Sequence, residues 1–259
     1  MDRCSRFSTV WLSDLHLGSK NCRVERLLDF LNEVDCEHLY LVGDIIDIKR
    51  LRRGIYWPAS HGEVLQKIVD MSKTGTRVTY IPGNHDDEFR KLCGMRFGDI
   101  EIVKNAIHTT ANDRRLLILH GDEFDGVIKC GPLLAAFGSV AYGFLISMNH
   151  IVHGFNDLFN RPYWSLAANV KSRVRNAMHY VEKFKAACLS AARDSGVDGV
   201  ICGHIHRAEI FEQDGIVYYN DGDWVESCTA LVEDDSGELS IVTWTDVVAT
   251  EPVTLKQAA

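Results

Sequence analysis

The first half of the chain alternates between short apolar runs and segments with helical periodicity. Residues 9–12, 38–42 and 77–81 are apolar runs of strand length. Between them, residues 24–34 and 61–72 carry apolar side chains at every third or fourth position, as one face of a helix does. Strands that alternate with helices are typical of βα units, so the sequence predicts an α/β fold with parallel strands.

The second half contains two more apolar runs, residues 116–119 and 199–202, and then changes character. Short β runs follow, separated by turn signals such as Asp214-Gly215 and the segment "EDDSGE", which predicts an antiparallel β tail. We expect a single domain over residues 1–259, with a helical insertion or cap at residues 126–195. The β runs are residues 209–211, 216–219, 229–232 and 239–244.

The composition and charge of the chain limit the classes of protein to which it can belong. A chain that is 46% hydrophobic and 25% charged is ordinary for a globular protein with a full core. Residues 1–9 lack the apolar region of a signal peptide, so we expect a cytoplasmic location and eight reduced cysteine thiols. The formal net charge of −8 disfavours a broad surface for nucleic acid, so no nucleic-acid partner is expected.

Polar side chains follow five of the apolar runs, at the point where each run ends. In "YIPGNHDDEF", for example, an apolar run leads directly into Asn84 and His85. In open α/β sheets, ligands bind beyond the carboxyl ends of the strands, where segments distant in sequence deliver side chains to one crevice. The candidate site residues are Asp14, His16, Asp44, Asp47, Asn84, His85, His120, His204 and His206.

These side chains offer imidazole, carboxylate and amide groups and no thiolate. Such sites suit Mn²⁺, Fe²⁺ and Zn²⁺, and the ligand types alone do not rank these ions. Seven ligands with one shared carboxylate fit two ions about 3.5–4 Å apart. Each motif alone is more often a turn, a helix cap or a structural histidine than a ligand, and only the complete series favours a metal site. The other histidines lack a strand-end position and are expected to be structural or solvated: His38, His61, His108, His150, His153 and His179.

The series Asp-x-His, Gly-Asp-x-x-Asp, Gly-Asn-His-Asp, His-Gly-Asp and Gly-His-x-His resembles that of the calcineurin-like metallophosphoesterases, over residues 10–224. Within that family the chain looks most like the branch of bacterial UDP-2,3-diacylglucosamine pyrophosphatases of lipid A synthesis, through "SDLHLG" and "GHIHR". The resemblance implies a sandwich of two β-sheets flanked by helices, with a helical insertion and a dinuclear site at the sheet edge. It also implies Mn²⁺ as the ion.

The resemblance assigns a role to each site residue. It places Asp14, His16, Asp44 and His206 on one ion, and Asn84, His120 and His204 on a second ion that shares Asp44. It places His85 against the scissile phosphate, with Asp47 holding the imidazole ring in orientation. The implied reaction is direct hydrolysis without a covalent enzyme intermediate.

The implied substrate is UDP-2,3-diacylglucosamine, cleaved at its pyrophosphate bond to UMP and the lipid monophosphate. The chain departs from the lipid A enzymes at two coupled positions. Those enzymes carry Arg where this chain has His85, and commonly a longer acid where it has Asp47. A paralogue that acts on a related ester, or a soluble phosphomonoesterase or phosphodiesterase with a small-molecule or nucleotide substrate, is therefore the alternative. A binding module without chemistry would show gaps among the ligands, and a nuclease is disfavoured by the acidic balance.

The insertion bears on the substrate. It opens with "PLLAAFGSVAYGFLISM", residues 132–148, which is short for a membrane-spanning helix. Residues 132–164 are expected either to bind acyl chains, with contact to the inner face of a membrane, or to pack as core, and the sequence leaves both open. The cations of the following helix, Lys171, Arg173 and Arg175, are equally consistent with a diphosphate site and with a solvated face. Asp122 and Asp223 flank the site motifs and are consistent with either a supporting role or a turn.

Overall fold

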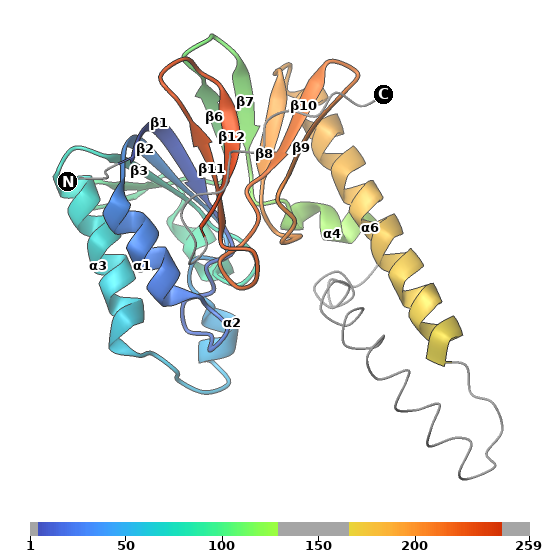
Figure 1. Ribbon diagram of the computed structural model, residues 1–259, viewed down its shortest axis with the longest axis horizontal. Coiled ribbons are helices and arrows are strands. Elements are labelled where there is room, and N and C mark those ends of the chain that lie inside the picture. Colours follow the sequence, from blue (N-terminus) through green and yellow to red (C-terminus); the bar gives the residue numbers. More distant parts are fainter. Residues whose placement is uncertain (1–4, 129–165, 245–259) are drawn as a thin grey trace. The chain divides into compact units, whose positions relative to one another are not determined.

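The computed structural model describes residues 5–128 and 166–244 (Figure 1), with the side chains of residues 127–128 and 166–176 left out. The described residues fall into two compact units, divided after Glu123 and before Cys188. The larger unit contains every strand, and the smaller one, Phe124–Ala187, contains the helix α4 (Asp125–Ile128) and most of α6 (Leu166–Asp194). No helix in these described stretches is long and apolar enough to cross a bilayer.

The larger unit is built on two β-sheets (Figure 1). The first has seven strands in the order β12-β11-β1-β2-β3-β5-β4, and its strands β1, β2 and β3 are mutually parallel. These strands are β1 (Ser5–Leu12), β2 (Val34–Val42), β3 (Arg77–Ile81), β4 (Arg96–Phe97), β5 (Ile100–Ile102), β11 (Thr229–Glu233) and β12 (Leu239–Thr243).

The second sheet has five strands in the order β6-β7-β8-β10-β9. Its central strands β7 and β8 run parallel, as do β8 and β10, whereas the edges are antiparallel hairpins. The expected hairpins of the β tail are therefore present, but they are divided between the two sheets. The strands are β6 (Ala106–Thr109), β7 (Arg115–Ile118), β8 (Gly199–Cys202), β9 (Glu209–Gln213) and β10 (Ile216–Asn220).

Two apolar cores hold this unit together. The first lies between the first sheet and the helices α1 (Val24–Glu33) and α3 (Ala59–Lys73), where Leu27 and Ile68 are fully or almost fully buried. The second lies between the sheets and joins Trp11 and Tyr40 of the first sheet to Ile201 of the second. The rings of Trp11 and Tyr40 stack in parallel at 5.7 Å. The predicted two-sheet fold with flanking helices is confirmed.

Several elements differ in extent from the sequence prediction. β1 and β2 begin earlier than expected, because Ser5 of β1 pairs with Val34 of β2, and Val34 therefore begins a strand instead of ending a helix. Strands β4, β5 and β6 were not predicted, since they are only two to four residues long and show little periodicity. The remaining elements are the short helix α2 (Ile48–Leu51) and the 3₁₀ helices Asp87–Leu92 and Asp122–Phe124.

Candidate metal centre

The structure brings all the sequence-predicted site residues to one edge of the larger unit. They lie in the loops that follow β1, β2 and β3 of the first sheet and β7 and β8 of the second. Because each set of strands is parallel, their carboxyl ends meet, as expected for a ligand site in such a fold. The order along the chain is Asp14 and His16, Asp44 and Asp47, Asn84 and His85, His120, then His204 and His206.

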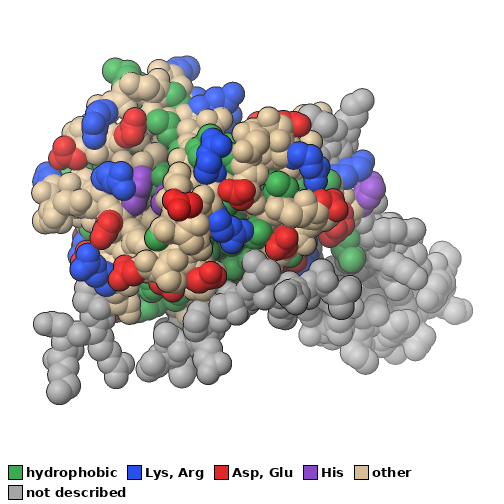
Figure 2. Space-filling view, turned by 90° about the horizontal axis from the view of Figure 1, so that it is seen from above, with side chains coloured by type: hydrophobic (Ala, Val, Ile, Leu, Met, Phe, Trp, Pro, Cys, Tyr) green, Lys and Arg blue, Asp and Glu red, His purple; other side chains and the backbone are tan. Residues whose placement is uncertain are grey.

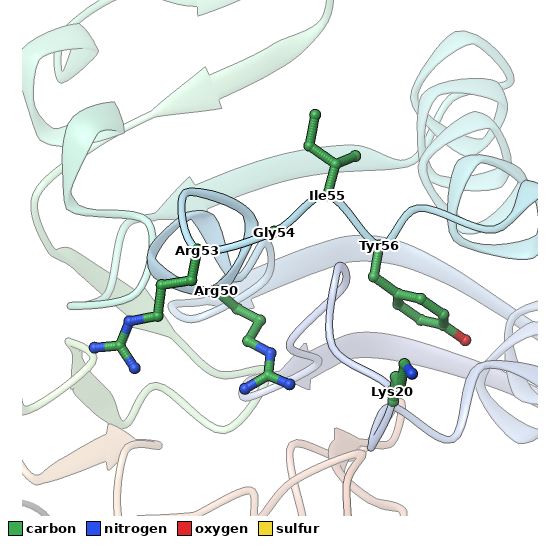
Figure 3. A pocket seen from close by; sticks show the side chains of 6 residues that line it. All are labelled: Lys20, Arg50, Arg53, Gly54, Ile55 and Tyr56. Atoms are coloured by element: carbon green, nitrogen blue, oxygen red, sulfur yellow. The ribbon is translucent and has the colours of Figure 1, made fainter.

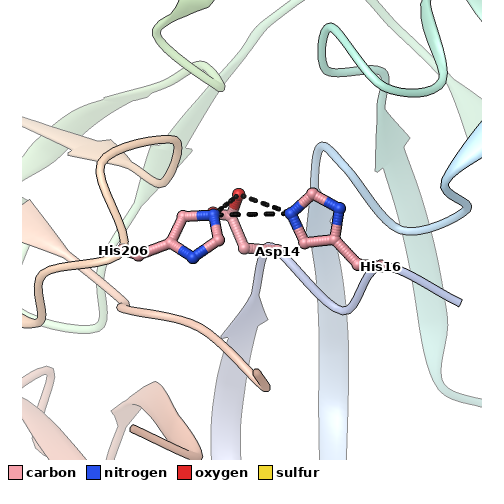
Figure 4. A group of neighbouring side chains, drawn as sticks. All are labelled: Asp14, His16 and His206. Carbon is pink, nitrogen blue, oxygen red and sulfur yellow. Dashed lines mark hydrogen bonds and ion pairs between the residues drawn. The ribbon is translucent and has the colours of Figure 1, made fainter. Parts of the chain in front are cut away.

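Asp14, His16 and His206 form a first group (Figure 4). The Nε2 atom of His206 lies 3.0 Å from Oδ1 of Asp14, and Nε2 of His16 lies 3.7 Å from the same oxygen. The two Nε2 atoms are 3.4 Å apart. One oxygen and two imidazole nitrogens that converge in this way could supply three ligands to a metal ion.

Asp44, His120 and His204 form a second group, whose ligand atoms lie within 4.8 Å of one another. His120 donates from Nδ1 to the Val42 carbonyl at 2.8 Å, which directs its Nε2 lone pair toward Asp44 Oδ2, 3.5 Å away. The same Oδ2 lies 3.9 Å from Nε2 of His16. Asp44 is therefore the carboxylate that touches both groups.

Three buried atoms of the centre test whether metal ions fit. Asn84 Oδ1 has no hydrogen-bond partner among the described residues. Asp14 Oδ1 and His120 Nε2 also form no hydrogen bond there, and each has only ion-pair contacts, the shortest to His206 Nε2 at 3.0 Å and to Asp44 Oδ2 at 3.5 Å, respectively. A buried polar atom without a hydrogen bond costs about 1–3 kcal/mol, so three in one place favour a group that all of them can contact. These atoms are oxygen or imidazole donors, which is the chemistry of a site for borderline divalent cations.

The charges of the centre depend strongly on one another. Burial alone would raise the pKa of Asp14, but the charge of His206 and the close contacts of His16 and His206 hold it well below its usual value. Burial would lower the pKa of His16, yet the neighbouring carboxylates of Asp14, Asp47 and Asp44 raise it to about 10. The carboxylates therefore stabilise a positively charged imidazole between them. The same electrostatic environment would stabilise a bound metal cation.

The backbone at the centre is strained. Asp14, His16, Asp44, His204 and His206 all have φ between 51° and 70°, in the left-handed region that costs an L-residue about 1–2 kcal/mol. Backbone hydrogen bonds between the loops after β1 and β2 maintain this geometry, from the N–H of Asp14 to the Gly43 carbonyl at 3.0 Å and from that of His16 to the Asp44 carbonyl at 2.9 Å. Strain that is over-determined by its surroundings is typical of functional sites.

Two glycines allow the ligands to approach the backbone. A Cβ on Gly43, whose φ is 82°, would collide with the ring of His120. A Cβ on Gly83 would collide with the Asp44 carboxylate and with His120. The glycines of the "GD" and "GN" motifs are therefore required for close approach of ligand to backbone.

His85 and Asp47, which the family resemblance pairs, are in contact in the structure. The Nδ1 atom of His85 lies 2.8 Å from Asp47 Oδ1, and the His85 ring is 33% exposed, against 9% for the Asp47 side chain. Asp47 also contacts a second ring, since its Oδ2 lies 3.6 Å from Nδ1 of His16. One carboxylate therefore orients both the exposed imidazole and a ligand of the first group.

Asp86 is a supporting residue that sequence analysis left without a role. It is fully buried, and its carboxylate accepts hydrogen bonds from the Tyr80 hydroxyl at 2.5 Å, the Gly83 N–H at 2.6 Å and the Ile45 N–H at 2.8 Å. Asp86 therefore joins the loop that carries Asn84 to the loop that carries Asp44. The available signal was its position in "GNHD", directly after two site residues.

Ser13 and Asp221 form a second support, beneath Asp14. Ser13 Oγ lies 2.7 Å from both Asp14 Oδ2 and Asp221 Oδ1. Burial raises the pKa of Asp221 well above its usual value. The Ser13 hydroxyl carries a single hydrogen, so it donates to one of these two carboxylates at a time. Sequence analysis noted "NDGDW" but did not single out Asp221.

The remaining acidic and histidine candidates make structural contacts. Asp122 receives two hydrogen bonds from the Arg90 guanidinium, at 2.6 and 2.7 Å, and Asp223 caps the turn of residues 225–227 through their backbone N–H groups. Three of the other histidines are buried and bonded, to Thr79, to the Gly18 N–H and to Glu233, and a fourth is exposed. They are His38, His61, His108 and His179, whereas His150 and His153 lie outside the described residues.

Comparison with known proteins agrees with this geometry. Residues 8–233 match the calcineurin-like phosphoesterase superfamily domain. The chain is 22% identical to a UDP-2,3-diacylglucosamine hydrolase of Haemophilus influenzae (strain PittGG) over 262 residues, which cover 90% of this chain and 98% of that protein. It is 23% identical to a protein of the same name from Blochmanniella pennsylvanica (strain BPEN) over 229 residues, which cover 78% and 80% of the two chains.

A solved structure supports the fold. Yfce, a phosphoesterase from E. coli, aligns with a TM-score of 0.50 at 15% sequence identity, over 96% of this chain and 99% of that one. The family match and the hydrolase names of the relatives confirm the prediction of a metal-dependent hydrolase of phosphoric esters or diphosphates. With 226 of its 259 residues inside the matched domain (residues 8–233), the chain belongs to the calcineurin-like phosphoesterase superfamily.

Proposed function

We propose that this chain is a two-metal pyrophosphatase that cleaves UDP-2,3-diacylglucosamine to UMP and the lipid monophosphate. The observation that carries the proposal is the position of Asp44 between two groups of candidate ligands, each with a buried polar atom that forms no hydrogen bond among the described residues. The substrate is suggested by the names of the relatives, whose length this chain covers almost completely in one case.

The proposed ligands divide into two sets that share Asp44. Asp14, His16 and His206 complete the first set, and Asn84, His120 and His204 complete the second. We propose Mn²⁺ as the ion in both, with Zn²⁺ and Fe²⁺ as alternatives that the same donor atoms accept. When bound, the ions would neutralise phosphoryl oxygens and lower the pKa of a coordinated water.

His85 is the proposed catalytic residue of the chain itself. The hydrogen bonds of His16 and His85 overcome burial and hold the pKa of Asp47 below its usual value, so Asp47 is ionised and His85 carries a hydrogen on Nδ1. The opposite nitrogen, Nε2, lies 4.0 Å from Asp44 Oδ2 and is the atom left to meet the substrate. There it stabilises charge on the phosphate or donates a proton to the leaving oxygen.

The same pair favours a second candidate function. Arg, which the lipid A enzymes carry at this position, is a fixed cation, whereas His exchanges a proton near neutral pH. An Asp47-oriented His85 therefore fits a general phosphomonoesterase or phosphodiesterase that acts on a small molecule or a nucleotide.

Hydrolysis of three substrates by one preparation separates the two candidates. Metal-stripped protein with Mn²⁺ restored is assayed on UDP-2,3-diacylglucosamine, p-nitrophenyl phosphate and bis-p-nitrophenyl phosphate, with Asp44→Ala as the control. Release of UMP at a far higher kcat/KM than for the chromogenic esters, lost in the control, supports the pyrophosphatase. Turnover of the chromogenic esters alone refutes it and supports the general phosphoesterase.

Contact with the inner face of a membrane also stays a proposal. The apolar run at residues 132–148, on which it rests, lies outside the described residues. Sedimentation of the protein with anionic liposomes at low salt tests it, and protein that stays in the supernatant would refute it.

A further inference from the structure

A pocket of about 450 Å³ lies between two loops that leave the metal centre (Figure 3). One loop continues from His16 to Lys20, and the other continues from Asp47 through α2 to Tyr56. Its lining residues are Lys20, Arg50, Arg53, Gly54, Ile55 and Tyr56. All six belong to the larger unit and are exposed, so an entering ligand can reach each of them.

The cations of this pocket lack acidic partners. Within the described part of the chain, no carboxylate forms an ion pair with Lys20, Arg50 or Arg53. Their neighbour Arg52 differs, because it pairs with Glu88 and does not line the pocket. The ammonium of Lys20 lies 5.6 Å from the centroid of the Tyr56 ring, and Figure 3 shows both side chains at one end of the pocket. Tyr56 therefore positions Lys20 through a cation–π contact.

Three cations line this pocket without an ion-pair partner among the described residues, although the chain as a whole is acidic. The formal net charge is −8, and acidic and basic side chains are interspersed on the face seen in Figure 2. Like charges that line the same pocket repel one another, and an anion that binds between them removes this repulsion. Arg and Lys together are the side chains that proteins use to hold phosphate.

Two contacts connect the loops that line the pocket to the metal centre. The Arg50 N–H donates to Asp47 Oδ1 at 2.9 Å, so the turn that carries Arg50 is fixed by the carboxylate that orients His85. The loop of Lys20 is fixed as well, since Leu17 bridges to Ile46 as strands do. The backbone that carries these cations is therefore anchored to the loops of the metal centre.

We infer that this pocket binds a second phosphate group of the substrate, adjacent to the one at the metal ions. The inference rests on the proposed function, because a pyrophosphate substrate presents two phosphate groups within reach of each other. In this arrangement Arg50, Arg53 and Lys20 hold the distal phosphate, and Tyr56 is the positioning residue of Lys20. The pocket selects diphosphates over simple esters.

Calorimetry of Mn²⁺-loaded protein tests this without turnover. The variants are Arg50→Gln and Arg53→Gln, and the matched control is Arg52→Gln, an equally exposed arginine of the same segment outside the pocket. We expect each pocket variant to bind uridine 5′-diphosphate about tenfold or more weakly, the value of a charge-assisted hydrogen bond to phosphate. Binding of orthophosphate, which has no second phosphate, should be the same in all proteins.

Steady-state kinetics and vesicles complete the test. KM for UDP-2,3-diacylglucosamine should rise in the pocket variants, with kcat/KM for bis-p-nitrophenyl phosphate unchanged. Pocket variants that match the Arg52→Gln control in diphosphate affinity overturn the inference. So do variants that lose only sedimentation with phosphatidylglycerol vesicles, since the pocket then binds lipid headgroups. If the wild-type protein hydrolyses only bis-p-nitrophenyl phosphate, the proposed pyrophosphatase function is refuted. The calorimetry then remains a separate test of whether the pocket binds a second phosphate group.

Discussion

Replacement of Asp86 by Asn tests how the centre is held together. The carboxylate is fully buried, and each of its oxygens accepts backbone hydrogen bonds. An Asn side chain presents one oxygen only, so its NH₂ group faces N–H donors and leaves about two of them without an acceptor. At about 1–3 kcal/mol for each buried donor without a partner, the free energy of unfolding should fall by about 2–6 kcal/mol. The donors are the N–H groups of Asp44, Ile45, Ile46 and Gly83 and the Tyr80 hydroxyl.

Urea denaturation of wild type, Asp86→Asn and Asp87→Asn measures this loss. Asp87 is the adjacent exposed carboxylate, so its variant controls for the change of charge. Since the lost hydrogen bonds hold the Asp44 and Asn84 loops together, manganese content, measured by atomic spectroscopy, should fall in Asp86→Asn alone. An Asp86→Asn protein as stable and as metal-rich as the control would refute the argument.

Three further outcomes are expected. His85→Gln should lower kcat by about 10²–10⁴ while the manganese content stays that of wild type, and a loss of metal would contradict the proposed role. Asp44→Asn should lose metal and activity together, and retention of both ions would refute a shared carboxylate. Burial and the charge of Arg77 lower the pKa of His38 from 6.5 to about 3 in the folded state. Between about pH 3 and pH 6.5 the unfolded state therefore binds more protons than the folded state. Stability should therefore fall with decreasing pH there by up to about 1.4 kcal/mol per unit, and an equally steep pH dependence in His38→Gln would contradict this.

The strand-end residues could be predicted because their signal is local. An apolar run that leads within one or two residues into Asp, Asn or His is visible in all five segments, three of them with Gly directly before the polar residue, and parallel strands bring such ends together whatever the length of chain between them. The pairing of His85 with Asp47 came from the family resemblance, and the distance of 2.8 Å is consistent with it.

What the sequence could not supply depends on tertiary contacts. Asp86, Asp221 and the turn residue Asp223 are ordinary loop acids in sequence and are all fully buried in the structure. Only their partners distinguish them: Asp86 accepts hydrogen bonds from the Asp44 loop, Asp221 contacts Ser13, and Asp223 caps its own turn. The early start of β2 at Val34 follows from pairing with β1, which no local periodicity records. The segment "IKRLRRG" is typical of a solvated surface, and only the structure shows that Arg52 forms an ion pair, whereas Arg50 and Arg53 form none with the described residues.

The left-handed backbone conformation of the ligand loops lowers the stability of the fold at the positions that the reaction needs. At the five positions from Asp14 to His206 where φ is positive, glycine would adopt the same conformation without strain. Single replacements of these ligands by glycine should therefore cost the fold less than replacements by alanine, although both destroy the site. In a descendant that no longer needed the reaction, glycine would therefore replace these residues at a lower cost in stability than alanine, and only selection for the reaction retains histidine and aspartate at positions with positive φ.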